Sequence, residues 1–133
     1  MALSPEVVFV CLHGSAKSLI AAELAQLTAK QRGLALRVAS MGTEPDPDVP
    51  AHVVAGLQAD GVDVRGRVPA MASAAAMAGA HCVVTFGPDV RAMAPQGSRI
   101  EEWKDVPNVG DGYDRARTEI RARIENLLGT LKH

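Results

Sequence analysis

Apolar residues along the chain fall into segments that predict strands and helices in alternation. Runs of Val, Ile, Leu and Phe predict four strands, because a strand buried on both faces is apolar nearly throughout. Apolar side chains that recur every three or four residues predict helices between these strands. The predicted strands are residues 7–11, 34–40, 81–86 and 98–103, and the predicted helices are 17–30, 51–59, 69–80, 89–94 (one or two turns) and 113–131.

Strands that alternate with helices form a parallel sheet with right-handed crossover connections. We therefore expect an α/β fold, a three-layer sandwich in which helices cover both faces of a four-stranded sheet. A chain of 133 residues can bury one sizeable core, so residues 1–133 are expected to form a single domain.

Composition and charge narrow the class of protein. The formal net charge is −1, so the charge balance gives no attraction to nucleic acid or to an anionic membrane. No apolar run approaches the ~20 residues that a membrane-spanning helix needs. The two cysteines, Cys11 and Cys82, fall on separate predicted strands and do not form a disulfide framework. We expect a cytoplasmic protein, a monomer or weak homodimer, that needs no metal or cofactor.

The segment from Glu6 to Leu27 carries the candidate chemistry. A strand reaches Cys11, a short loop of small residues follows, and a helix begins. A loop that enters a helix directs several main-chain N–H groups and the positive end of the helix dipole to one place, which suits an anion. A cysteine at such a place is more readily ionised than a free thiol. With Lys17 and Ser18 in the first helical turn, the pattern predicts a thiolate that faces a bound tetrahedral oxyanion.

This segment allows two other interpretations, a core residue and a nucleotide-binding loop. A cysteine that ends a buried strand is often only a small core residue. A nucleotide-binding P-loop needs a glycine directly before the lysine and another five residues earlier, but Ala16 and Cys11 stand at those places. The P-loop is therefore excluded, and the core residue remains an alternative.

The sequence from Val7 to Ser18 resembles the signature of the low-molecular-weight tyrosine phosphatases and the related thioredoxin-coupled arsenate reductases, in which Cys-(x)5-Arg-Ser follows an apolar strand. The resemblance continues at residues 39–45, 61–64, 83–85 and 103–108. It implies a strand order of 2-1-3-4 along the sheet. It also implies that Cys11 is the nucleophile, that Ser18 hydrogen-bonds the thiolate, and that the loop binds phosphate through Leu12, His13, Gly14, Ser15, Ala16, Lys17 and Ser18.

Three departures from the family pattern bear on the chemistry. Lys17 replaces the loop arginine, and an ammonium does not give the planar two-pronged contact of a guanidinium. Asn108 stands after Pro107, where the resemblance implies a general-acid aspartate. The reductases carry resolving cysteines after the third strand, where this chain has none. Asp105 and Asp111, in the same late loop, are the candidates to replace the missing acid.

Three functions follow from the match and the departures. The first is a cysteine-dependent phosphatase, which would hydrolyse phosphate monoesters of the phosphotyrosine type through a cysteinyl-phosphate intermediate, if slowly. The second is an arsenate reductase that uses a partner thiol. The third is a pseudo-enzyme that binds an oxyanion or a phosphoprotein without catalysis. Phosphate, sulfate or arsenate is the expected ligand in each case, and a phosphotyrosine protein is a candidate partner.

Overall fold

The computed structural model describes residues 4–131, so the two ends of the predicted domain 1–133 lie outside the described residues. The strands are β1 (Glu6–Cys11), β2 (Arg37–Gly42), β3 (Ala70–Met71), β4 (Cys82–Thr85) and β5 (Arg99–Glu102). The helices are α1 (Lys17–Gln31), α2 (Ala51–Ala59), the 3-10 helix η1 (Val109–Asp111) and α3 (Tyr113–Thr130).

All strands pair in parallel in one sheet, as expected for an α/β fold, but the sheet differs from the one predicted. It has five strands in the order β3-β2-β1-β4-β5, not four; the predicted strands correspond to β2, β1, β4 and β5, which lie side by side in that order. The extra edge strand is β3, which pairs Ala70 with Met41 and Met71 with Gly42. Because β1 lies in the centre, its last residue, Cys11, stands beside Gly42 of β2.

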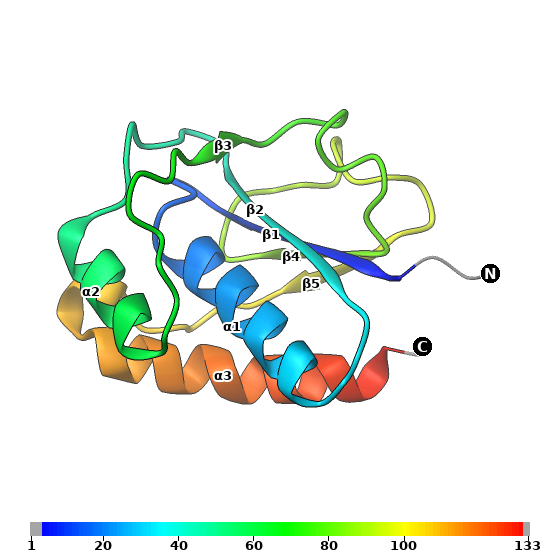
Figure 1. The fold of residues 1–133 in the computed structure, drawn as a ribbon. Coiled ribbons are helices and arrows are strands. Elements are labelled where there is room, and N and C mark those ends of the chain that lie inside the picture. The colour runs from blue at the N-terminus through cyan, green and yellow to red at the C-terminus, as the bar shows by residue number, and fades with distance from the viewer. Residues whose placement is uncertain (1–3, 132–133) are drawn as a thin grey trace.

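The prediction of helices on both faces was wrong. Helices α1, α2 and α3 lie together on one side of the sheet, and irregular segments cover the other (Figure 1). In the alanine-rich stretch 69–80, the Ser73 hydroxyl accepts the N–H of Ala76 at 3.1 Å and the Ser73 carbonyl accepts that of Met77, which makes a turn. In 89–94, the N–H groups of Met93 and Ala94 both donate to the Val90 carbonyl, and Pro95 then stops the turn.

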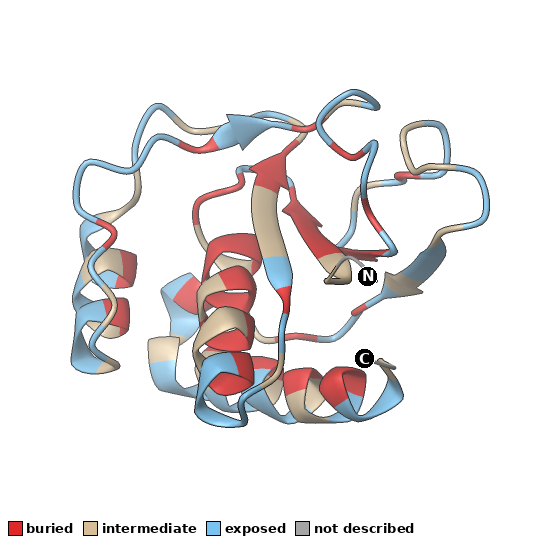
Figure 2. Ribbon diagram, turned by 45° about the vertical axis from the view of Figure 1, so that its right-hand side comes forward, coloured by how far each residue is buried: buried red, intermediate tan, exposed pale blue. Residues whose placement is uncertain are grey.

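Side chains of the central strand alternate between two apolar clusters. Val7 and Phe9 pack against the helices, whereas Val8 and Val10 face the irregular segments. The cluster under the helices is much the larger, and Figure 2 shows the buried stripes of the helices turned toward the sheet. Within residues 4–131, no helix is both long and apolar enough to cross a membrane.

Candidate functional site

The loop between β1 and α1 encloses the sulfur of Cys11. Sγ of Cys11 lies 3.0 Å from Oγ of Ser18 and accepts the Gly14 N–H at 3.1 Å. Cys11 is only 7% exposed, yet it lines a cavity of about 430 Å³ that opens to solvent. The sulfur therefore has two hydrogen-bond partners and lies at a place that a ligand can reach.

The N-terminus of α1 is open toward this loop. No side chain caps the helix, and its first turn contains no acidic residue. Among residues 4–131, no acceptor is found for the N–H groups of Leu12, His13 and residues 15–18, whereas the N–H of Ile20 donates to Ala16. Unsatisfied N–H groups and the positive helix end together favour an anion at this position.

The chain that follows β2 holds the loop in its shape. Glu44 N–H donates to the Leu12 carbonyl at 2.7 Å, and Asp46 N–H donates to the His13 carbonyl at 3.0 Å. Gly14 has a φ of +65°, and a Cβ built on it would lie 2.7 Å from the backbone nitrogen of Gly42. Glycine is required at both places because the two backbones touch.

Most of the predicted site residues line this cavity. Gly14 and Ser18 are buried and hydrogen-bond the sulfur, but they do not line the cavity. Asp105 and Asp111 are also absent from the wall, although Asn108 is present. The wall consists of the predicted residues Cys11, Leu12, His13, Ser15, Ala16, Lys17 and Asn108, and of Asp46, Pro50, His52, Phe86, Val109 and Gly110, which the sequence did not single out as site residues.

Asp46 connects the loop to the acidic segment after β2. Its Oδ2 accepts the Ser15 hydroxyl at 2.6 Å, and its Oδ1 lies 3.4 Å from Nδ1 of His13. The same ring nitrogen lies 3.2 Å from the Glu44 carbonyl. An acidic, proline-rich loop was visible in the sequence, but nothing in its spacing indicated that one carboxylate would bind two loop side chains.

An aromatic cluster fixes the wall on the β4 side. Phe86 packs edge-on against Trp103, with ring centroids 5.7 Å apart, and Trp103 packs in the same way against Phe9 of β1. The indole N–H of Trp103 donates to the Glu101 carboxylate at 3.0 Å. Phe86 is therefore held rigidly next to the cavity.

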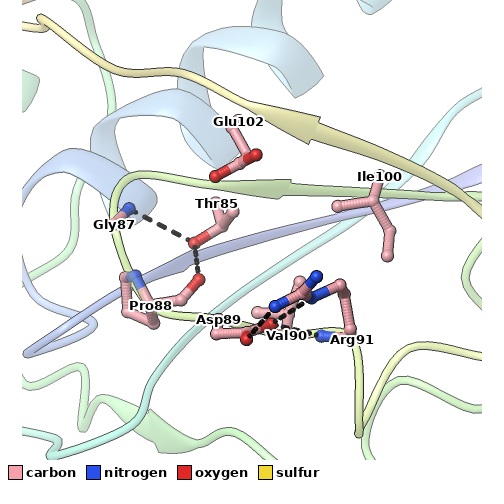
Figure 3. A pocket seen from close by; sticks show the side chains of 8 residues that line it. All are labelled: Thr85, Gly87, Pro88, Asp89, Val90, Arg91, Ile100 and Glu102. Carbon is pink, nitrogen blue, oxygen red and sulfur yellow. Dashed lines mark hydrogen bonds and ion pairs between the residues drawn. The ribbon is translucent and has the colours of Figure 1, made fainter.

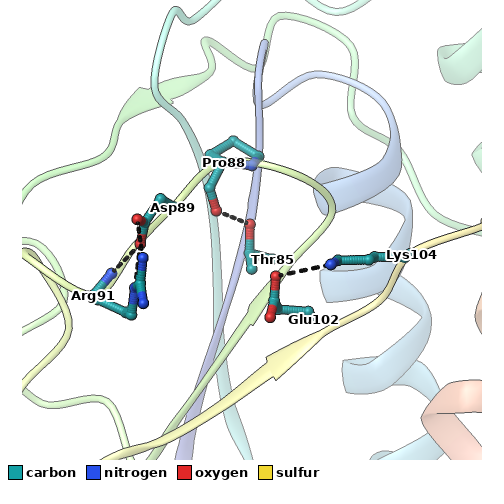
Figure 4. Close-up of polar contacts among 6 residues, drawn as sticks. All are labelled: Thr85, Pro88, Asp89, Arg91, Glu102 and Lys104. Atoms are coloured by element: carbon teal, nitrogen blue, oxygen red, sulfur yellow. Dashed lines mark hydrogen bonds and ion pairs between the residues drawn. The ribbon is translucent and has the colours of Figure 1, made fainter.

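A second cavity, of about 380 Å³, lies at the ends of β4 and β5 (Figure 3). The hydroxyl of Thr85 donates to the Pro88 carbonyl at 2.7 Å, and Arg91 pairs with Asp89 at 2.8 Å (Figure 4). The Arg91 guanidinium holds the pKa of Asp89 at about 2. The wall of this second cavity contains no cysteine or histidine, and its cation, Arg91, is already paired with Asp89. This cavity therefore does not offer comparable chemistry.

Cys82 lies at the far end of the sheet from Cys11. It pairs with Val7, four residues before Cys11 on β1, which places it about 13 Å away along the strand direction. Burial raises the pKa of the Cys82 thiol, and its side chain is 1% exposed. In this fold it is a core residue. Among the described residues, no cluster of three or more His, Cys, Asp or Glu side chains could hold a metal ion.

A known protein family matches nearly the whole chain. The family model described as low molecular weight phosphotyrosine protein phosphatase matches residues 6–133. The chain belongs to this family.

Solved structures from this low molecular weight phosphatase family and its reductase relatives share the fold. The thioredoxin-dependent arsenate reductase Cg_ArsC1' of Corynebacterium glutamicum is 24% identical, with a TM-score of 0.79 over 97% of this chain; this chain spans only 62% of that one. A low molecular weight protein tyrosine phosphatase from T. tengcongensis is 18% identical, with a TM-score of 0.84 over 96% of this chain and 100% of that one. Vibrio vulnificus Wzb, in complex with benzylphosphonate, is 14% identical, with a TM-score of 0.78 over 96% and 99%.

Proposed function

We propose that this protein is a cysteine-dependent phosphatase that hydrolyses phosphate monoesters of the phosphotyrosine type. The observation that carries the proposal is the position of Cys11 Sγ, between the Ser18 hydroxyl and the Gly14 N–H at the floor of an open cavity. Family membership and the phosphonate bound to Wzb support a tetrahedral oxyanion as the ligand, with phosphate, sulfate and arsenate as the simplest cases.

The reaction takes two steps. The Cys11 thiolate attacks phosphorus, an S–P bond forms, and the ester P–O bond breaks with its electron pair on the leaving oxygen. Water then attacks phosphorus, the S–P bond breaks, and inorganic phosphate and the thiolate are released. The Ser18 hydroxyl, 3.0 Å from the sulfur, stabilises the thiolate at the start and when it leaves.

Charge on the phosphoryl oxygens is balanced by the loop N–H groups and by Lys17. Lys17 lines the cavity and has no ion-pair partner among the described residues, so its ammonium is free to contact a ligand. An ammonium makes one contact with a phosphoryl group, whereas a guanidinium makes two. Lysine therefore stabilises the transition state less well than arginine. A slow enzyme is the expected result.

The chemistry of the cavity wall favours an aryl ester. Leu12 is 44% exposed at the mouth, and Phe86 lies in the wall with Pro50, so an aromatic ring can pack on apolar surface while its phosphate reaches the loop. A phosphotyrosine side chain on a partner protein has this shape. Because a thiolate nucleophile needs a reducing compartment, we infer a cytoplasmic protein.

A pseudo-enzyme that only binds the oxyanion is the second candidate. It is favoured by Asn108, an amide in the cavity wall where the family has an acid, and by the position of Asp105 and Asp111 outside that wall. Arsenate reduction by this chain alone is disfavoured, because Cys82 is buried and four strand residues away from the loop. A reductase would need an external thiol.

Steady-state turnover of p-nitrophenyl phosphate tests the proposal. We expect activity in the wild type and none in Cys11→Ser. Lys17→Ala should lower kcat/KM by roughly 10- to 100-fold, the value of one charged contact. The matched control is Arg91→Ala, which removes the cation of the second cavity and should leave kcat/KM unchanged. Phosphate binding without turnover of this activated ester would instead support the pseudo-enzyme.

A further inference from the structure

The leaving group of an unactivated ester needs a proton, and the cavity limits its source. The titratable side chains in the wall are Cys11, His13, Lys17, Asp46 and His52. Cys11 is the nucleophile, and Lys17 is needed as a cation. Asp46 accepts the Ser15 hydroxyl and faces the His13 ring, so its carboxylate is already committed. Two histidines remain, and their surroundings differ.

His13 is held in one orientation by oxygen atoms. Its Nδ1 lies 3.2 Å from the Glu44 carbonyl and 3.4 Å from Oδ1 of Asp46. Both neighbours are acceptors, so Nδ1 carries the hydrogen and Nε2 is left for other partners. Asp46 is itself fixed by the Ser15 hydroxyl, and Ser15 is 1% exposed. A buried hydroxyl, a carboxylate and an imidazole thus form a connected series that ends at the cavity.

This arrangement resembles the way a carboxylate orients a histidine in nucleophilic enzymes and stabilises its imidazolium. His52, the second residue of α2, is exposed and has no hydrogen bond or ion pair among the residues 4–131. The charged and titratable groups near His13 are Asp46 on the segment after β2, Lys17 on α1, Cys11 on β1 and His52 on α2. Among these, only Asp46 is in contact with its ring.

We propose that His13 is the proton donor to the leaving group and that Asp46 positions it; this rests on the proposed phosphatase function. As the P–O bond breaks, the imidazolium gives its Nε2 proton to the leaving oxygen and becomes neutral. In the second step, Nε2 accepts a proton from the attacking water while the S–P bond breaks. The imidazolium is then restored. The other ring hydrogen remains on Nδ1 of His13 throughout, directed at the Glu44 carbonyl and the Asp46 carboxylate. The proton donor thus lies in the loop between β1 and α1, and not in the loop after β5.

Two esters with different leaving groups test this assignment. Phenolate from phenyl phosphate needs a proton, whereas p-nitrophenolate is a good leaving group without one. We expect His13→Gln to lower kcat for phenyl phosphate by about 100-fold or more, and kcat for p-nitrophenyl phosphate by less than about tenfold. We also expect the wild type to lose phenyl phosphate activity toward alkaline pH, and this loss should be absent in His13→Gln. Asp46→Asn should shift the ratio of the two esters in the same direction by a smaller factor.

His52→Gln is the matched control, because it changes the other histidine in the same wall and should affect both esters alike. Activity on p-nitrophenyl phosphate reports that each variant is folded. If the wild type hydrolyses neither ester, or Cys11→Ser hydrolyses either, the proposed function fails. If the wild type is active but His13→Gln lowers both esters equally or neither, or His52→Gln carries the selective loss, the assignment of His13 is overturned while the phosphatase remains.

Discussion

At the scale of single residues, the two cysteines show how surroundings decide reactivity. Cys11 has two hydrogen-bond partners, the Ser18 hydroxyl and the Gly14 N–H, and lines a cavity. Cys82 is enclosed in the core beneath the helices, and burial raises the pKa of its thiol. Because the thiolate is the nucleophile that attacks an alkylating reagent, the two thiols should differ sharply in their rate of alkylation.

We therefore expect iodoacetamide at neutral pH to label Cys11 in the native protein and Cys82 only after unfolding. Phosphate should slow the labelling of Cys11 by occupying the same loop. Mass spectrometry of the intact protein and its peptides gives the site and the rate. Cys11→Ser should take up no label before unfolding, and native labelling of Cys82 at a comparable rate would contradict this account.

Tyr113 presents a second case, on the helix that closes the far side of the core. Its ring packs on Gly56, where an added Cβ would lie 2.2 Å from the ring. Within the described part of the chain, its buried hydroxyl has no hydrogen-bond partner. Burial, with the nearby charge of Asp60, raises the pKa of Tyr113 to about 12. A buried donor without a partner costs stability.

Tyr113→Phe should therefore leave the protein as stable or more stable, by about 0–1 kcal/mol at neutral pH. The pH dependence has a definite sign. Below pH 10 the phenol is neutral in both states; between pH 10 and about 12 the unfolded chain loses this proton first, so the free energy of unfolding falls as pH rises. Urea unfolding of wild type and Tyr113→Phe across this range should show the extra fall only in the wild type. The same pH dependence of the free energy of unfolding in both proteins would refute the raised pKa of Tyr113.

At the scale of elements, the site depends on the contact between the loop of residues 12–16, which joins β1 to α1, and the end of β2. Gly14 adopts a left-handed conformation, and its neighbour across the contact is Gly42. A Cβ built on Gly42 would lie 2.5 Å from the Gly14 nitrogen. The loop can enclose Cys11 only because neither residue has a side chain.

Gly14→Ala should destabilise the protein by about 2–4 kcal/mol, because it combines left-handed strain with a backbone clash. Gly33→Ala is the matched control: its φ is +69°, but nothing lies within 4 Å of the added Cβ. Strain alone should cost it roughly 1 kcal/mol. Thermal and urea unfolding measure both variants, and equal losses would show that the contact with Gly42 is unimportant.

Elements with strong local signals were predictable from the sequence. Helix α2 matches its predicted bounds. The strand, loop and helix around Cys11 were also predictable, because an apolar run, a short stretch of small polar residues and a stretch with helical spacing follow one another directly. The stretch 69–80 was wrongly predicted as a helix. Its alanines suit a helix by propensity, but residues 74–76 are exposed and offer no apolar stripe to pack on the sheet.

The candidate site divides in the same way. The predicted site residues from Cys11 to Ser18 are contiguous, so a single motif was enough to predict them. Asp46, His52 and Phe86 reach the cavity from three other segments, and only the folded chain brings them together. Asp105 was chosen for its place in the right loop, but it adopts a φ of +65° and lies outside the cavity wall. Nearness in sequence does not determine the direction of a side chain.

At the scale of the whole molecule, the two faces of the sheet are covered in different ways. Three helices and a large apolar cluster cover one face, and their ends are tied by ion pairs such as Arg117 with Asp60 at 2.6 Å and Arg32 with Glu125. The other face is covered by turns that bury a few small or flexible side chains, among them Met77 and Val90. Few buried contacts and isolated turn hydrogen bonds permit local opening.

The rate of amide hydrogen exchange should therefore differ between the layers on the two faces of the sheet. We expect residues 74–79 to exchange about 100-fold or more faster than residues 22–29 of α1, since only turn hydrogen bonds hold them. Residue 83 of β4 is the internal control, because the sheet should protect it although its side chain packs under the same turns. Phosphate should slow exchange in 12–18 and leave 74–79 unchanged, because β1, β2 and α1 hold the cavity independently of those turns. Uniform protection of both faces would mean that the irregular layer is as stable as the helices.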